Sequence, residues 1–115
     1  MAEEGRALNR RHLIYYLEVN DLGSGELLGH LVDITTKGIK LVSKKPIETG
    51  KKFKLQMLLP EDYFHQRAVK FDAESLWSTN DVNPDFYDTG FKVSQMNNEA
   101  SDIITTLINQ LGFNN

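Results

Sequence analysis

Hydrophobic and polar side chains alternate in six segments of the chain, and this alternation predicts six short β-strands. Successive side chains of a strand point to opposite faces, so an alternating segment can bury one face and expose the other. The predicted strands cover residues 13–19, 26–34, 39–43, 53–59, 68–77 and 87–95. In the fifth strand one face would hold Val69, Phe71, Ala73, Ser75 and Trp77.

Near the C-terminus the period of the hydrophobic residues becomes helical, which predicts one amphipathic helix. Its apolar stripe would consist of Ile103, Ile104, Leu107, Ile108 and Leu111. Either Asn97 or Asn98 can cap the start of the helix, and Gly112 stands where a C-terminal glycine commonly ends one.

These elements predict an all-β fold: a six-stranded antiparallel β-barrel with a C-terminal α-helix. Closing the sheet removes the exposed edges on which small sheets aggregate, and the helix can cover the barrel with its apolar stripe. We expect residues 1–12 to form a flexible arm that contains arginines. Residues 13–115 would form the barrel and the helix.

Composition agrees with one folded domain and narrows the functional classes. The 115 residues are 40% hydrophobic and 25% charged, contain no cysteine and carry a net charge of −3. No apolar run approaches the ~18 residues of a membrane span, so we expect a cytoplasmic protein without membrane insertion. The acidic balance also argues against a nucleic-acid partner.

Candidate chemistry for an enzyme or a metal site is weak. His12, His30 and His65 are scattered over different elements without the spacing of metal ligands. No nucleophile-elbow or phosphate-loop pattern surrounds any serine or threonine. We therefore expect a non-enzymatic protein without a metal or a cofactor.

A polar trio lies at the turn between the second and the third predicted strand, where residues 32–42 read VDITTKGIKLV. Asp33 and Thr35 can bond nearby backbone amides, and Gly38 can supply the positive φ of a tight turn. The same three residues could instead form the hydrogen-bonding edge of a ligand site at the rim of a sheet. The pattern alone leaves both interpretations open.

Basic residues lie before and after this trio. Arg6, Arg10 and Arg11 precede the first strand, and their planar guanidinium groups suit phosphate oxygens and the guanine edge, although terminal arginines are often only solvated. The lysines that follow the trio are Lys37, Lys40, Lys44 and Lys45. These lysines could add positive potential near an anion. We interpret them instead as solvated charges that protect an edge strand from aggregation.

In their order along the chain, these features resemble the PilZ domain family. The resemblance is carried by Arg10-Arg11, by the sequence DITTKG at residues 33–38, by Trp77 and by the sequence GFKV at residues 90–93. It implies a bacterial six-stranded β-barrel with a C-terminal helix. Many members of the family bind the second messenger cyclic di-GMP.

The family's binding motif has two halves, R-x-x-x-R and [DN]-x-[SA]-x-x-G. The second half matches residues 33–38, with Thr35 in the serine position. For the first half, literal spacing selects Arg6 and Arg10, whereas the family's usual distance to the first strand pairs Arg10 with Ile14, which cannot donate a hydrogen bond.

The resemblance implies a cyclic di-GMP receptor that passes its signal to an unidentified protein partner, in motility or biofilm formation, as a monomer or a homodimer. Arg10, with Arg6 or Arg11, would bind phosphate and guanine, and Asp33 would accept from the guanine N–H groups. Thr35 would add a polar contact, and Gly38 would leave room in the pocket. Trp77 would offer a stacking surface, although a tryptophan in a small barrel is more often part of the core.

Two alternatives use the same elements. The first is a PilZ-like adaptor that binds no nucleotide and acts through protein contacts only, and Ile14 favours it. The second is a barrel that binds single-stranded nucleic acid. That function requires a basic groove with exposed aromatic residues, so the acidic charge disfavours it.

Overall fold

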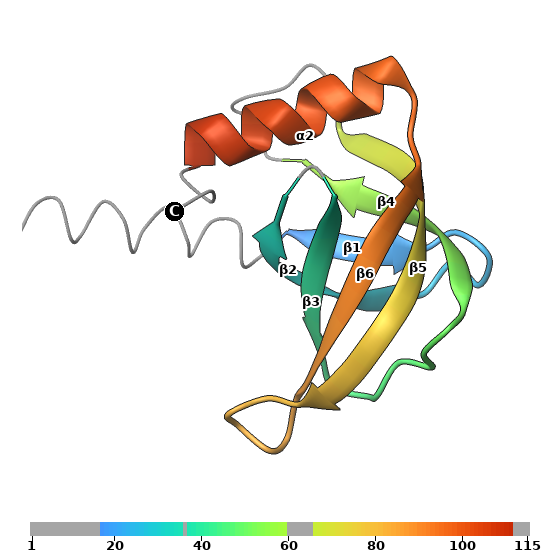
Figure 1. Cartoon of the computed structure of the whole chain (residues 1–115), viewed down its shortest axis with the longest axis vertical. Coiled ribbons are helices and arrows are strands. Elements are labelled where there is room, and N and C mark those ends of the chain that lie inside the picture. Colours follow the sequence, from blue (N-terminus) through green and yellow to red (C-terminus); the bar gives the residue numbers. More distant parts are fainter. Residues whose placement is uncertain (1–16, 36, 60–65, 112–115) are drawn as a thin grey trace, which may run out of the picture.

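The computed structural model describes residues 17–35, 37–59 and 66–111, which form six strands and one helix (Figure 1). The strands are β1 (Glu18–Asp21), β2 (Leu27–Ile34), β3 (Gly38–Ser43), β4 (Lys52–Leu58), β5 (Ala68–Asn80) and β6 (Tyr87–Gln95). The helix is α2 (Asn98–Leu111). None of the helical segments in the described ranges is both long and apolar enough to cross a membrane.

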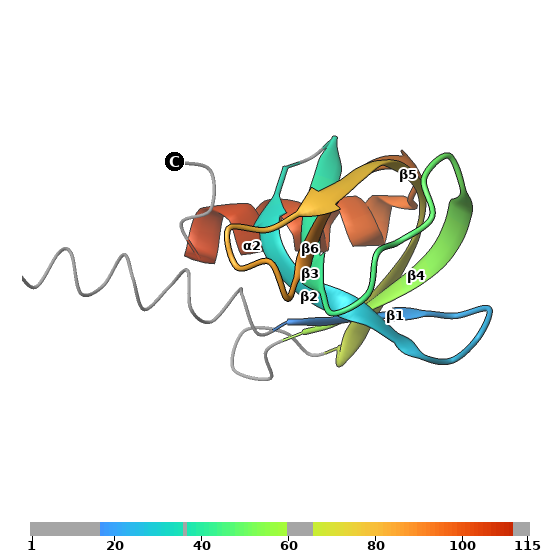
Figure 2. The ribbon, with the colours of Figure 1, turned by 90° about the horizontal axis from the view of Figure 1, so that it is seen from below.

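The six strands close into a barrel in the order β1-β2-β3-β6-β5-β4, and every neighbouring pair is antiparallel. The short strand β1 completes the circle because it pairs with β2 on one side and with β4 on the other. Figure 2 views the barrel from the end opposite α2 and shows how the strands curl round one interior. The predicted fold class is confirmed.

The barrel interior and the apolar face of α2 share one hydrophobic core. Leu31, Leu41 and Leu55 from three strands are fully buried, as are Ile104 and Leu107 from the helix. The helix lies across one end of the barrel (Figure 1) and seals it with this apolar stripe.

Local sequence also places the start of the helix. The Oδ1 atom of Asn97 accepts a hydrogen bond from the backbone N–H of Ala100 at 2.8 Å, so Asn97 is the N-cap. Gly112 and the side chain of Leu111 lie outside the described residues, as does the arm of residues 1–12.

One buried polar side chain fastens the connection between β3 and β4 to the barrel. Ser75 is fully buried, donates a hydrogen bond to the carbonyl of Glu48 at 2.6 Å and accepts one from the N–H of Lys51 at 3.1 Å. A buried hydroxyl that is hydrogen-bonded in this way avoids the desolvation penalty of an unpaired one. Its burial agrees with the alternation predicted for β5.

The boundaries differ from the prediction by more than one residue at two strands. β1 continues to Asp21, into the segment expected to turn, and its predicted residues 13–16 lie outside the described ranges. β5 extends to Asn80 because its last residues pair with β6 as far as Tyr87.

Truncating the helix stripe should destabilise the whole barrel. Leu107 is 1% exposed within the shared core, so Leu107→Ala removes apolar contacts and leaves a cavity, which typically costs ~2–5 kcal/mol. Urea unfolding measures the change. Thr105→Ala, at an exposed position of the same helix, should stay within ~0.5 kcal/mol of the parent. Equal stability of the two variants would contradict sealing by α2.

Candidate functional site

Four residues form one row across the outer surface of the barrel. Asp33 on β2 pairs with Lys40 on β3, Lys40 pairs with Gly90 on β6, and Gly90 pairs with Trp77 on β5. Asp33 and Trp77 are predicted ligand-binding residues. Lys40 and Gly90, which lie between them, are not among the predicted site residues. Neighbouring strands are ~4.8 Å apart, so the row spans ~14 Å.

Two β-bulges place the ends of this row on the outside. The register of β2 against β3 shifts at Val32, and that of β5 against β6 shifts at Leu76. An extra residue reverses the alternation of the side chains that follow it. Asp33 is consequently exposed although Leu31, two residues earlier, is buried.

The same effect corrects the prediction for Trp77. The alternation placed Trp77 on the buried face with Ser75, and a core position was considered the commoner one for a strand tryptophan. Trp77 is instead 43% exposed and Leu76 is 54% exposed, whereas Ser75 is fully buried. The bulge at Leu76 turns the indole outward, where it is available to a ligand.

Gly90 supports the indole from below. A Cβ atom at Gly90 would collide with the indole atoms Nε1 and Cε2 of Trp77. The indole therefore lies directly against the backbone of β6, and only glycine permits this approach. Gly90 is thus a positioning residue for Trp77.

The turn between β2 and β3 is stabilised by the polar trio itself. Thr35 Oγ1 accepts hydrogen bonds from the N–H groups of Lys37 at 3.1 Å and Gly38 at 3.2 Å. Asp33 Oδ1 accepts from the N–H of Ile34 at 2.9 Å. The turn interpretation is therefore confirmed for Asp33 and Thr35.

Gly38 is required for a different reason from the one expected. Among the described residues, the glycines with positive φ are Gly25 and Gly50, so Gly38 does not supply a left-handed turn. A Cβ atom at Gly38 would instead collide with the carbonyl oxygen of Phe91 on β6. The glycine permits close packing of β3 against β6.

The row and the turn together line an open pocket of about 360 Å³. Its lining residues are Asp33, Ile34, Thr35, Gly38, Ile39, Lys40, Leu76, Trp77, Gly90 and Phe91. The pocket brings together four of the seven predicted site residues, namely Asp33, Thr35, Gly38 and Trp77. Arg6, Arg10 and Arg11 lie outside the described residues, and their role stays a prediction.

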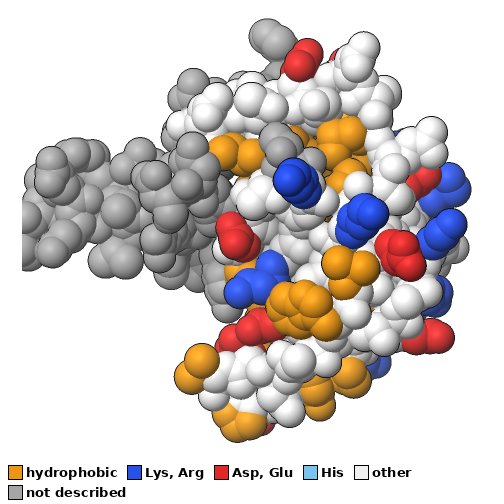
Figure 3. Space-filling model, viewed as in Figure 1, with side chains coloured by type: hydrophobic (Ala, Val, Ile, Leu, Met, Phe, Trp, Pro, Cys, Tyr) orange, Lys and Arg blue, Asp and Glu red, His pale blue; other side chains and the backbone are white. Residues whose placement is uncertain are grey.

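Lysines make this surface more basic than the chain as a whole. Lys40 lines the pocket, and Lys37 and Lys92 line an adjoining pocket that shares Thr35, Gly38 and other residues with it. Figure 3 shows hydrophobic side chains on this face beside basic and acidic ones. The edge-strand interpretation of the lysines is wrong, because β3 lies between β2 and β6 in a closed barrel.

A carboxyl pair adjoins Lys40. Partial burial, followed by a hydrogen bond with Asp81, raises the pKa of Asp88 above the ordinary carboxyl value. The same hydrogen bond and the backbone N–H of Asn83 lower the pKa of Asp81, and the positive charge of Lys40 favours the ionised form of both. The last proton of the pair is therefore held by Asp88.

No family model matches the chain, and no curated protein matches its sequence. Solved structures do match. The inhibitor of motility MotI/DgrA of Bacillus subtilis superimposes with a TM-score of 0.68 and 18% identity over 86% of this chain and 48% of that one. YcgR of Escherichia coli in complex with c-di-GMP superimposes with a TM-score of 0.62 and 14% identity, over 84% of this chain and 41% of that one.

The isolated PilZ domain of Escherichia coli YcgR with c-di-GMP gives a TM-score of 0.58 and 15% identity, covering 84% of this chain and 81% of that one. The chain therefore has the PilZ-like fold, which confirms the resemblance seen in its sequence. It spans about half or less of the length of the MotI and YcgR chains that it matches.

Displacing the indole tests the support by Gly90. Trp77 is the only tryptophan of the chain, so its emission reports on this position alone. Gly90→Ala should push the indole off β6 and increase its quenching by acrylamide. Ser94→Ala, at an exposed position of the same strand, should leave quenching unchanged. Unaltered quenching in a folded Gly90→Ala protein would refute the packing described.

Carboxyl NMR titration tests the pair beside Lys40. As pH rises, Asp81 should lose its proton first and Asp88 later. Asp81→Asn removes a neighbouring negative charge and should lower the pKa of Asp88. Stability from the raised pKa of Asp88 is present at low pH and is lost as pH rises through that pKa. Simultaneous titration of Asp81 and Asp88 would contradict the coupling.

Proposed function

We propose that this chain is a non-enzymatic cytoplasmic signalling domain that binds cyclic di-GMP at the row of Asp33, Lys40, Gly90 and Trp77. The observation that carries the proposal is the placement of a carboxylate, an ammonium group and an exposed indole in one row along a pocket. Support comes from the solved structures of the same fold that contain c-di-GMP.

Each member of the row suits one part of the ligand. The Asp33 carboxylate is an acceptor for the N1–H and N2–H₂ donors of guanine. The Lys40 ammonium group offers its charge to a phosphate, and the exposed face of Trp77 offers a surface on which a purine can stack. A row of ~14 Å has room for a base and a phosphate side by side.

The arginine arm completes the proposed site. Arg10, together with Arg6 or Arg11, would clamp the phosphates and a guanine edge with charge-assisted hydrogen bonds. Ligand binding would then order the arm over the pocket. A protein partner would read this change, in motility or surface attachment.

A second candidate function is an adaptor that binds no nucleotide and acts through protein contacts. Ile14 at the usual position of the second arginine favours it. The carboxyl pair of Asp81 and Asp88 favours it as well, because its negative charge beside Lys40 opposes the binding of a dianion.

Calorimetric titration with cyclic di-GMP separates the two candidates. We expect binding by the parent chain, accompanied by a change in Trp77 emission. Asp33→Ala and Arg10→Ala should each weaken binding by at least ~1.5 kcal/mol, since each removes a charged hydrogen-bond partner. Asp33→Asn should weaken it comparably. The asparagine side chain keeps an oxygen that can accept from the N–H of Ile34. It also presents an N–H₂ group, which cannot accept hydrogen bonds from the donors of guanine.

Asp102→Ala is the matched control, because Asp102 is an exposed carboxylate on α2. This variant should bind as tightly as the parent. Absence of heat and of any emission change in the parent would reject nucleotide binding and favour the adaptor.

A further inference from the structure

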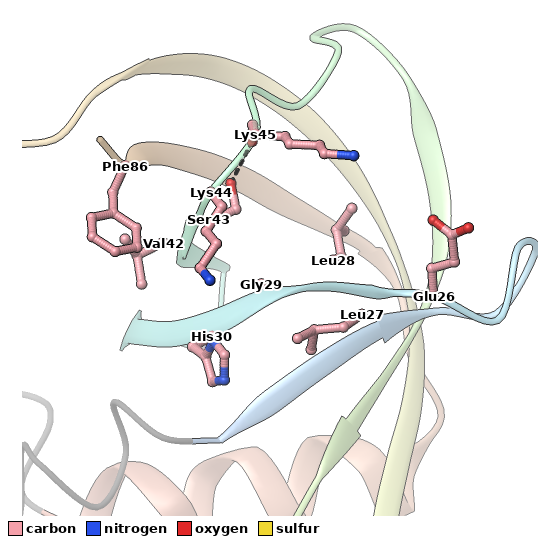
Figure 4. Close-up of a pocket in the computed structure, with 10 residues that line it drawn as sticks. All are labelled: Glu26, Leu27, Leu28, Gly29, His30, Val42, Ser43, Lys44, Lys45 and Phe86. Carbon is pink, nitrogen blue, oxygen red and sulfur yellow. Dashed lines mark hydrogen bonds between the residues drawn. The ribbon is translucent and has the colours of Figure 1, made fainter. Parts of the chain in front are cut away.

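A second pocket, of about 520 Å³, lies between β2, the end of β3 and the loop before β6. Its lining residues are Glu26, Leu27, Leu28, Gly29, His30, Val42, Ser43, Lys44, Lys45 and Phe86 (Figure 4). It shares no residue with the pocket of the proposed nucleotide site. Its volume falls within the ~300–1,000 Å³ typical of ligand sites.

The pocket exists because two strands separate. β2 pairs with β3 only as far as His30 and Val42. Before that point β2 follows β1, whereas the end of β3 follows β6 through the pairing of Ser43 with Tyr87. The gap between the diverging strands forms the pocket, and Phe86 borders it beside Val42 (Figure 4).

Apolar surface lines and surrounds this gap. Val42 is only 6% exposed, although it does not belong to the cluster that forms the barrel core. Residues on the outer side of the barrel therefore bury it. Leu27 is 52% exposed. Exposed apolar groups at a pocket are typical of protein interfaces.

Two lysines give the mouth of the pocket a positive charge. Lys44 and Lys45 both line the pocket, and Figure 4 shows the side chain of Lys44 directed toward β2. Ser43 Oγ donates to the carbonyl of Lys45 at 2.7 Å and so fixes the backbone here. Glu26 is the one acidic residue of the lining. The local charge is thus opposite in sign to the net charge of the chain.

We propose that this pocket docks a partner protein through an apolar side chain that is flanked by carboxylates. The apolar walls would take the side chain, and Lys44 and Lys45 would pair with the flanking acids. The exposed Leu27 and the exposed Lys44 and Lys45 favour a protein over a small apolar molecule, because a protein segment can contact an apolar group and two charges at once. This docking does not depend on nucleotide binding and applies equally to an adaptor.

Three synthetic peptides of equal length test the proposal with the full chain. The first carries Leu-Phe between aspartates and glutamates, the second carries Leu-Phe between lysines, and the third carries Ser-Ser between the acids. Amide NMR shifts are followed during titration. The first peptide should shift Leu28, Gly29, Val42 and Phe86 saturably, and the other two should bind at least tenfold more weakly.

Charge reversal identifies the contribution of the lysines. The double variant Lys44→Glu/Lys45→Glu should bind the first peptide at least tenfold more weakly, and Leu27→Ser should weaken binding without disturbing the core. Lys51→Glu/Lys52→Glu, at exposed positions before and at the start of β4, is the matched control and should bind normally. Cyclic di-GMP titration of the same variants should be unchanged, so a failure of either proposal can be recognised separately.

Three results would overturn the docking proposal. They are equal binding of the acidic and the basic Leu-Phe peptides, shifts confined to residues away from the pocket, and absence of binding by the acidic Leu-Phe peptide at millimolar concentration.

Discussion

Closure of the barrel by the pairing of β1 with β2 and β4 is the constraint on which the rest of this structure depends. Within the closed barrel β2, β3, β6 and β5 stand side by side and present Asp33, Lys40, Gly90 and Trp77 as one row. Without β1 the sheet would end at β2 and β4, so β2, which carries Asp33, would lie at an exposed edge.

The candidate site lies where the regular alternation fails. Bulges at Val32 and Leu76 bend their strands and turn the next side chain outward, so a carboxylate and an indole face solvent from opposite sides of the row. Local departures from an otherwise consistent pattern are often functional. Among the four register shifts of the described strands, these two occur on strands that bound the same pocket.

The two proposed surfaces share one strand. Along the outer face of β3 and its continuation, Lys40 lines the nucleotide pocket, and Val42 and Lys44 line the docking pocket. Asp88 pairs with Val42 and acts electrostatically on the row through Lys40. The two proposed surfaces therefore lie toward opposite ends of the same strand.

The strand periodicity, the amphipathic helix with an asparagine cap at residue 97 or 98, and the turn that contains Asp33, Thr35 and Gly38 all follow from the sequence. These features depend on neighbours a few residues apart, so their signals are local. Tertiary structure was needed to show that Trp77 is exposed, that Lys40 lies in the pocket, and why glycine is needed at residues 38 and 90. Those properties depend on register between strands distant in sequence, where one extra residue in a strand reverses which face its side chains occupy.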